Sequence, residues 1–302
     1  MSSATHLPPS ADIRHLEPPA EEPSRRRWTP YWLLLPGLAW LVIFFAIPMV
    51  TLASTSLQEG SLETGYEITW RWQNYTDALS TYYPHFVRSF FYAGIATVLA
   101  LLLSYPLAYA IAFKAGRWKN VLLVLVIAPF FTSFLVRTLA WTTILADNGW
   151  LVETLQTVGI LGADGRLLAT PIAVVTGLTY NFLPFMTLPL YASLDRMDQR
   201  LVEAATDLYA SAFTAFRKVT FPLSLPGVVA GTLLTFIPAS GDYINAELLG
   251  TPRQYMIGNV IDSQFLVRLD YPTAAALSFV LMAAILVIVI VYIRRAGTED
   301  LV

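Results

Sequence analysis

The sequence predicts an all-α membrane protein with six transmembrane helices. Of its 302 residues, 56% are hydrophobic and only 13% are charged, whereas soluble domains carry about 25% charged residues. Six windows are apolar and long enough to cross a bilayer, because a spanning helix needs about 20 mostly apolar residues. Basic residues are also distributed unevenly between the connecting segments, which is typical of a polytopic membrane protein.

The chain begins with a polar tail that precedes the first window. Residues 1–28 are rich in proline and mixed charges; they cannot bury a core, so we expect a disordered tail. The charge-free run that follows is too long for a signal peptide, and we interpret it as a retained span. We expect one six-helix domain over residues 29–295 and a C-terminal tail over 296–302. The predicted spans cover residues 31–58, 89–113, 121–145, 167–194, 219–241 and 271–293.

The basic residues orient these spans. With the N-terminus in the cytoplasm, 13 of the 19 bases lie on the cytoplasmic side, as the positive-inside rule requires. The acids divide evenly, 10 inside and 11 outside, so the bias lies in the bases alone. We therefore expect both termini in the cytoplasm. The 13 bases are Arg14, Arg25, Arg26, Arg27, Lys114, Arg117, Lys119, Arg196, Arg200, Arg217, Lys218, Arg294 and Arg295.

Several function classes are disfavoured by residues that the sequence lacks. It has no cysteine, and its three histidines are scattered, so we expect neither thiol chemistry nor a metal site. None of its lysines follows a glycine, so the Gly-Lys-Ser/Thr signature that binds phosphate is absent. ATP would then have to be bound by another chain. A membrane enzyme would need clustered catalytic side chains, and an ion-coupled secondary transporter would need intramembrane acids; only Asp242 lies near a span edge.

The predicted cytoplasmic segment 195–226 has the spacing of an amphipathic helix. Two rows of residues four apart would form one apolar face. The rows are Ala205, Tyr209 and Phe213, and Leu208, Ala212 and Phe216. Pro222 and Pro226 are expected to end the helical run.

The charges of this segment indicate what its polar face meets. Residues 201–209 carry two acids, Glu203 and Asp207, and no base. Helices that lie on lipid headgroups usually carry Lys and Arg on the polar face. Docking into a cleft of another protein is therefore favoured, and a helix on the membrane surface is the alternative.

The stretch EAATDLYASAFTAFRKVTFPLSLPG, from Glu203 to Gly227, resembles the EAA loop of binding-protein-dependent ABC transporter permeases. The matching positions are Glu203, Ala204, Ala205, Leu208, Ala210, Ser211, Phe216, Val219 and the exit from Pro222 to Gly227. The resemblance implies the MetI-like fold and a coupling helix seated in a cleft of an ATPase subunit, with Glu203 paired to a base of that subunit. Asp207 and Tyr209 lie inside this coupling segment.

Tyr209 departs from the family pattern, which has glycine at this position. Glycine permits the positive φ of a tight turn at no steric cost, whereas a bulky residue finds positive φ costly. We therefore expect either a turn with ordinary backbone angles or a helix that continues through Tyr209.

Four other stretches resemble the spermidine/putrescine permeases of the PotB/PotC kind, PotB more closely. They are Pro129–Trp141, Gly177–Tyr191, Pro238–Gly250 and Ile257–Phe265, and the likeness covers about residues 31–295. Permeases for sulfate, iron, thiamine or phosphonate share parts of the pattern and remain alternatives.

The resemblance also implies the transporter complex to which such a chain belongs. It implies a transport subunit in a bacterial plasma (inner) membrane, without a cofactor or catalytic residues of its own. ATP and Mg would be bound by two ABC ATPases of the PotA kind. The other expected partners are a second permease of the PotC kind, or a second copy of this chain, and an extracytoplasmic binding protein of the PotD kind.

The residues near the outer ends of the spans indicate a substrate pathway. A cationic amine would be held by carboxylates and aromatic faces. The candidates are Asp242, Tyr243 and Glu247, with Trp141 and Tyr180 as neighbours. The alternative is that Asp242 caps a helix and Glu247 is a solvated loop charge. Arg137, which would repel a polycation, is interpreted as a gate or inter-subunit salt bridge, with snorkelling to headgroups as the alternative.

Overall fold

The computed structural model describes residues 29–162 and 164–296. The predicted tail 1–28 and residues 297–302 lie outside the described residues. Within the described part the chain is mostly helical, with one two-stranded hairpin. Its contacts divide it after Thr51 into two compact units.

The first unit is an apolar helix with a local irregularity. The helix α1 (Thr29–Leu41) leads into the π-helical turn η1 (Val42–Ala46) and then into α2 (Ile47–Ser56), which crosses the boundary between the units. Together they give 26 helical residues, Tyr31–Ser56, that are long and apolar enough for a span. The first predicted span therefore has a continuous helical counterpart.

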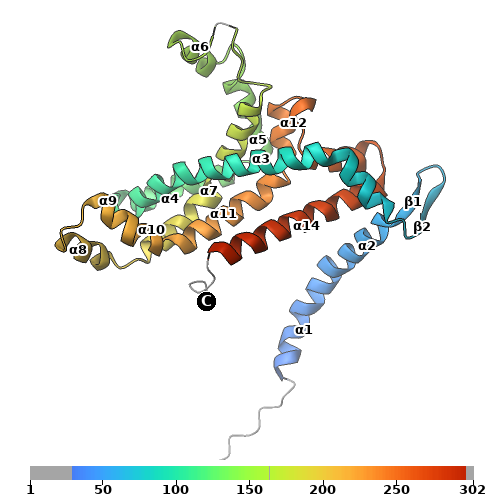
Figure 1. Ribbon diagram of the computed structural model, residues 1–302, viewed down its shortest axis with the longest axis horizontal. Coiled ribbons are helices and arrows are strands. Elements are labelled where there is room, and N and C mark those ends of the chain that lie inside the picture. The colour runs from blue at the N-terminus through green and yellow to red at the C-terminus, as the bar shows by residue number, and fades with distance from the viewer. Residues whose placement is uncertain (1–28, 163, 297–302) are drawn as a thin grey trace, which may run out of the picture. The chain divides into compact units, whose positions relative to one another are not determined.

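The second unit begins with a hairpin that the sequence did not predict. Strand β1 (Gln58–Ser61) pairs antiparallel with β2 (Gly65–Ile68). Gly60 and Gly65 both have positive φ, +134° and +80°, which glycine adopts readily. Figure 1 shows the hairpin at the beginning of α3 (Gln73–Tyr109).

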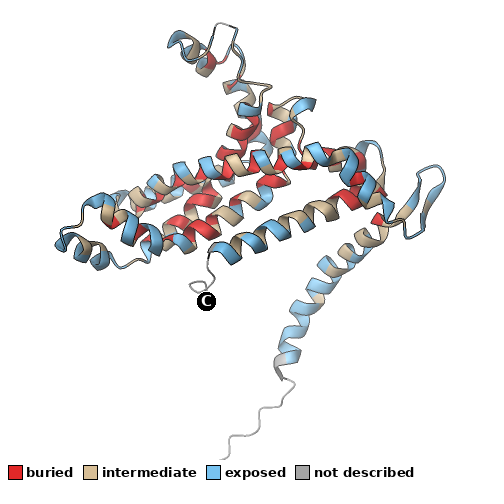
Figure 2. Ribbon diagram, in the orientation of Figure 1, coloured by how far each residue is buried: buried red, intermediate tan, exposed pale blue. Residues whose placement is uncertain are grey.

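Four long helices form the frame of this unit. They are α3, α7 (Pro171–Asp195), α11 (Leu225–Ser240) and α14 (Tyr271–Ala296). Helix α3 contacts the other three, and α7 also contacts α11. Figure 2 shows the buried residues concentrated where α3, α7 and α11 face one another. One core cluster, which contains Met186, Leu190 and Val228, lies between these three helices.

Small residues allow α7 and α11 to approach closely. A Cβ atom added at Gly227 would lie 2.8 Å from the Pro189 carbonyl oxygen, and one at Gly231 would lie 3.0 Å from the Met186 oxygen. The two glycines are four residues apart on α11, which is the small-xxx-small spacing of packed membrane helices. The glycines therefore set the distance between the two helices.

Two of the predicted spans are bent rather than straight. In the part of the chain that the structure describes, four helices are each long and apolar enough to cross a membrane, and up to six segments qualify if each bent pair counts as one span. The residues 116–131 and 134–144 meet at 96°, and 212–223 and 225–240 meet at 62°. The single window 121–145 is therefore not one helix. Pro129 lacks an N–H for the helical ladder, and Thr132 is extended.

Shorter helical segments connect the four long helices. The segments before α7 are η2 (Ala110–Lys114), η3 (Gly116–Trp118), α4 (Lys119–Ile127), η4 (Ala128–Phe131), α5 (Phe134–Ile144) and α6 (Trp150–Thr157). Those after α7 are α8 (Gln199–Asp207), α9 (Ala212–Ala215), η5 (Phe216–Thr220), α10 (Phe221–Leu223), α12 (Ile244–Leu249), η6 (Pro252–Gln254), α13 (Ile257–Asp262) and η7 (Ser263–Val267).

The two ends of α3 carry different loops. In Figure 1, α8 and α9 lie near the end of α3 and the hairpin lies at its beginning. Lys119, just after η3, forms an ion pair with Asp195 at the end of α7, with 2.5 Å between Nζ and Oδ1. The Tyr191 hydroxyl donates to the other carboxylate oxygen at 3.1 Å. The loops after α3 and after α7, both rich in bases, are therefore joined.

Candidate functional site

The EAA loop, residues 195–226, contains α8 and a second helical run made of α9, η5 and α10, joined by a tight turn. Asp198 caps α8 by accepting a hydrogen bond from the Arg200 N–H at 3.0 Å. Ser211 caps α9 by accepting one from the Thr214 N–H at 3.2 Å. Such caps satisfy backbone donors that a helix N-terminus leaves without partners. The sequence thus defines both helix starts locally.

The turn between them is closed by two backbone hydrogen bonds. The Tyr209 N–H donates to the Thr206 carbonyl at 3.0 Å, and the Ala210 N–H donates to the Ala205 carbonyl at 3.1 Å. This pair of bonds is the Schellman motif, in which the residue after the C-cap adopts the left-handed conformation. That residue is Tyr209.

Tyr209 has φ +61°, so both expectations for this position are wrong. The turn does not use ordinary backbone angles, and the helix does not continue. The two hydrogen bonds impose the left-handed conformation that the family's glycine would adopt freely, and a non-glycine residue pays roughly 1–2 kcal/mol for it.

The reversal also divides the predicted apolar face. Ala205 lies on α8 and Phe213 on α9, so the two rows of residues do not form one continuous stripe. The helical run does continue through Pro222 in α10 and breaks at Ser224, before α11.

The tip of the EAA loop exposes large apolar side chains and acids together. Tyr209 is 99% exposed, Leu208 82% and Phe213 71%. Glu203 and Asp207 are also exposed, whereas Ala205 is half-buried. A protein surface with both apolar and acidic groups is the kind of surface that a partner can cover.

The base of the EAA loop is tied to α3 by aromatic rings. The Phe216 and Tyr105 rings lie edge to face, 5.5 Å apart, and Phe221 lies 6.1 Å from Tyr105. The Tyr105 hydroxyl also forms a 2.7 Å hydrogen bond with Ser224, at the break before α11. A displacement of the loop can therefore act on α3 and α11 directly.

Two of the predicted pathway residues meet the predicted gate residue in one cleft. The Trp141 and Tyr180 rings lie edge to face, 5.3 Å apart. With Arg137 they line a cleft of about 220 Å³ between α5 and α7. Arg137 is only 9% exposed, its Nε and Nη1 atoms have no hydrogen-bond partner, and its guanidinium lies 5.6 Å from the Phe134 ring. The cleft therefore presents a desolvated cation beside two aromatic rings.

Asp242 occupies a different place, where it caps α12. Its carboxylate accepts from the Asn245 backbone N–H at 2.8 Å and from the Asn245 side chain at 3.1 Å. The Asn181 amide donates to Asn245 at 3.1 Å and to Thr138 at 3.0 Å. Asp242 is buried and does not line the cleft of Arg137. The expected single group of acids and aromatic rings is therefore divided.

Glu247 and Tyr243 belong to the same edge as Asp242. Both are exposed, and the Asn259 amide joins them by donating to the Tyr243 carbonyl at 2.9 Å and to the Glu247 carboxylate at 3.2 Å. Burial raises the pKa of the nearby Tyr255 hydroxyl, and its hydrogen bond with Glu247 raises that pKa further. Glu247 is thus held in place rather than freely solvated.

The polar residues that connect these helices were missed by the sequence analysis. They are Thr138, Asn181, Asn245 and Asn259, all buried. Asn181 could have indicated these contacts, since it lies inside a charge-free span. Polar groups at membrane depth generally pair with one another or face a cavity. Among the described residues, no three His, Cys, Asp or Glu side chains lie close enough together to hold a metal ion.

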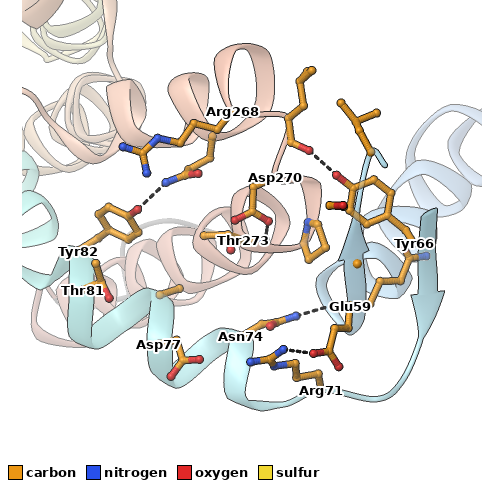
Figure 3. A pocket seen from close by; sticks show the side chains of 18 residues that line it. Glu59, Tyr66, Arg71, Asn74, Asp77, Thr81, Tyr82, Arg268, Asp270 and Thr273 are labelled. Atoms are coloured by element: carbon orange, nitrogen blue, oxygen red, sulfur yellow. Dashed lines mark hydrogen bonds and ion pairs between the residues drawn. The ribbon is translucent and has the colours of Figure 1, made fainter. Parts of the chain in front are cut away.

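A larger polar cleft lies away from all the predicted site residues. It has a volume of about 690 Å³ and lies between the hairpin, the start of α3 and the segment before α14. Figure 3 shows Asp77, Arg268 and Asp270 around it, with Arg71 paired to Glu59 at one side. Because both signs of charge line it, the cleft suits a polar protein surface better than a single type of ion.

Comparisons with known proteins identify the family. The model of the binding-protein-dependent transport system inner membrane component family matches residues 100–296. The chain is 39% identical over 259 residues to the spermidine/putrescine transport system permease protein PotB of Haemophilus influenzae, covering 85% of this chain and 90% of that protein. It is 36% identical over 260 residues to PotB of Escherichia coli, covering 86% and 94%.

Solved structures agree with this result at the level of the fold. A bacterial ABC transporter involved in the import of the acidic polysaccharide alginate has a chain that matches with a TM-score of 0.66 at 20% identity, covering 91% of this chain and 97% of that chain. The family match, the relatives and the fold agree, and the expected resemblance is confirmed. This chain belongs to the binding-protein-dependent transport system inner membrane components, the permease subunits of ABC importers.

Proposed function

We propose that this chain is a permease subunit of an ATP-driven importer of spermidine and putrescine. The observation that carries the proposal is the identity of 39% over 85% of the chain to a permease named for these two amines. The chain itself would be a transport subunit of the bacterial inner membrane, with both termini in the cytoplasm. ATP and Mg would be bound by two separate ATPase subunits.

The EAA loop would couple ATP hydrolysis to transport. Its exposed tip and acids fit a partner that offers an apolar cleft with a base for Glu203. Phe216 contacts Tyr105 of α3, and Tyr105 bonds Ser224 before α11. Motion of the ATPases would therefore move two long helices at once and switch access from outside to inside.

The opposite end of α3 would meet the extracytoplasmic binding protein. The cleft between the hairpin and the segment before α14 carries exposed acids and bases from three elements. Mixed charges of this kind favour orientation of a partner protein over tight binding of a small solute. A second permease, either similar or a copy of this chain, would complete the pathway.

Inside the pathway, this chain would offer the amine few direct ligands. Asp242 is already engaged with Asn245, and Arg137 would repel a polycation. Trp141 and Tyr180 could contribute aromatic faces, which attract cationic amines. Selectivity would then come mainly from the binding protein and from the second permease.

The substrate is tested with the reconstituted transporter. Proteoliposomes containing both permeases and the ATPases would be given the binding protein loaded with spermidine, putrescine, sulfate or thiamine. We expect ATP hydrolysis and uptake to rise only with the amines. Stimulation by sulfate or thiamine alone would replace the amine assignment with that solute.

Coupling is tested with a charge reversal on the EAA loop. Glu203→Arg should weaken co-purification of the ATPase and reduce transport, because like charges in a closed interface repel. The matched control is Glu153→Arg, also an exposed helical glutamate, on α6. If Glu203→Arg assembles and transports like the control, this loop is not the ATPase docking segment.

A further inference from the structure

The tip of the EAA loop holds a tyrosine in a backbone conformation that favours glycine. Tyr209 has φ +61°, and its side chain is 99% exposed. Almost none of the ring surface is therefore covered by the rest of the chain. Packing of the ring within this subunit therefore does not offset the free-energy cost of the strained backbone.

The turn itself does not need the tyrosine. It is closed by the backbone N–H groups of residues 209 and 210, which donate to Thr206 and Ala205. Glycine would form the same two bonds and has no Cβ atom to crowd against the backbone. The reason for a ring at this position therefore lies outside the chain.

We propose that Tyr209 is an anchor with which this permease recognises its own ATPase subunit. The ring, with Leu208 beside it, would enter an apolar pocket of the ATPase, next to the base that receives Glu203. Aromatic anchors that are rigidly presented and become fully buried carry much of the affinity of protein interfaces. The two hydrogen bonds fix the backbone of the turn from which the exposed ring projects. This inference rests on the proposed docking of the EAA loop on an ATPase.

The membrane surface is the competing location for the ring, since tyrosine also collects at the headgroups. The charges of the loop favour the protein partner. Helix α8 exposes two acids, Glu203 and Asp207, and one base near its start, Arg200, so its net charge is negative. Anionic headgroups would repel this helix, whereas a basic rim on the ATPase would attract it.

Three variants separate the ring from the turn. Tyr209→Phe keeps the ring, whereas Tyr209→Gly and Tyr209→Asn keep the left-handed turn and remove it. The complete permease pair, in nanodiscs, would be titrated with the ATPase. We expect Tyr209→Phe to bind within about threefold of the wild type. The Gly and Asn variants should bind at least about tenfold more weakly, as the loss of an interface anchor predicts, although their melting temperature should be no lower than that of the wild type because the strained turn is relieved.

This titration tests whether the Tyr209 ring contributes to ATPase binding and whether the EAA loop docks on the ATPase. If Tyr209→Gly binds the ATPase as tightly as the wild type, the ring is not an anchor. Glu203→Arg is measured alongside. A loss of binding in Glu203→Arg with none in Tyr209→Gly overturns the anchor and leaves the docking loop intact, whereas normal binding in both overturns the docking loop itself.

A labelling experiment distinguishes the ATPase from the membrane. The chain has no cysteine, so Tyr209→Cys is the only thiol in this subunit. In nanodiscs with anionic lipid, a charged maleimide should react quickly with the permease alone and at least about tenfold more slowly after the ATPase is added. Slow reaction before the ATPase is added would place residue 209 in the bilayer surface and overturn the proposal.

Discussion

Replacing Gly227 by alanine would place a methyl group where α7 and α11 touch. The added Cβ atom would lie 2.5 Å from the Ser193 Cβ atom, 2.8 Å from the Pro189 carbonyl oxygen and 3.2 Å from the Leu190 Cα atom. Carbon atoms in contact prefer separations of about 3.5–4.0 Å. The two helices would therefore have to separate by about 1 Å at this level, and two of the three atoms belong to the rigid backbone of α7.

The size of the effect follows from two opposing contributions. Forcing an extra carbon into a packed interface costs about 1–3 kcal/mol. Alanine in a helix is favoured over glycine by at most about 1 kcal/mol, so the net loss at Gly227 reaches about 2 kcal/mol. Gly94 on α3 provides the matched control, because nothing lies within 4 Å of its added Cβ atom. The difference between the two alanine variants isolates the steric cost.

The assay is unfolding of the purified permease in mixed detergent micelles, followed by helix content. We expect Gly94→Ala to be as stable as the wild type or more stable, and Gly227→Ala to be less stable than Gly94→Ala by about 1–3 kcal/mol. Equal stability of the two variants would show that α7 and α11 are not in contact at the separation described above.

Three further changes test other contacts. Asn181→Leu leaves buried Asn245 without its donor and should cost about 1–3 kcal/mol of unfolding free energy in the same assay; an unchanged value would contradict the network. Tyr105→Phe removes the hydrogen bond to Ser224 but keeps the ring, so the free energy of unfolding should fall by about 0.5–1.5 kcal/mol. Loss of ATPase coupling without a change in this free energy would contradict a structural role for the hydrogen bond. Arg137→Leu removes a buried guanidinium with unpaired N–H groups, so the melting temperature of the isolated chain should rise; a fall would reveal a stabilising partner.

Much of the fold could be predicted from the sequence because the membrane imposes simple requirements. A span needs about 20 apolar residues, and four of the predicted windows match helices that are long and apolar enough to cross. The residues from Glu203 to Gly227 also pointed to the right family, because the motif is long. Orientation by basic residues remains a prediction.

The bends of the other two spans were not predictable from hydropathy. The apolar window 121–145, broken only by Arg137, continues across the 96° bend, so hydropathy alone gives no sign of it. The bend depends on backbone hydrogen bonds that Pro129 cannot donate and on the extended conformation of Thr132. The hairpin at residues 58–68 was missed because its strands are only four residues each.

The arrangement of the candidate site residues was also only partly predictable from the sequence. Acids and aromatic rings along the sequence suggested one pathway group, but Asp242 caps α12 and Trp141 meets Tyr180 elsewhere, because separate helices carry them. At Tyr209, steric preference argued against a left-handed turn. The sequence by itself determined that this chain is a membrane permease, since apolar length and a long motif are local properties. Only the tertiary structure decided how the loop turns and which side chains meet, since those depend on hydrogen bonds and packing between segments.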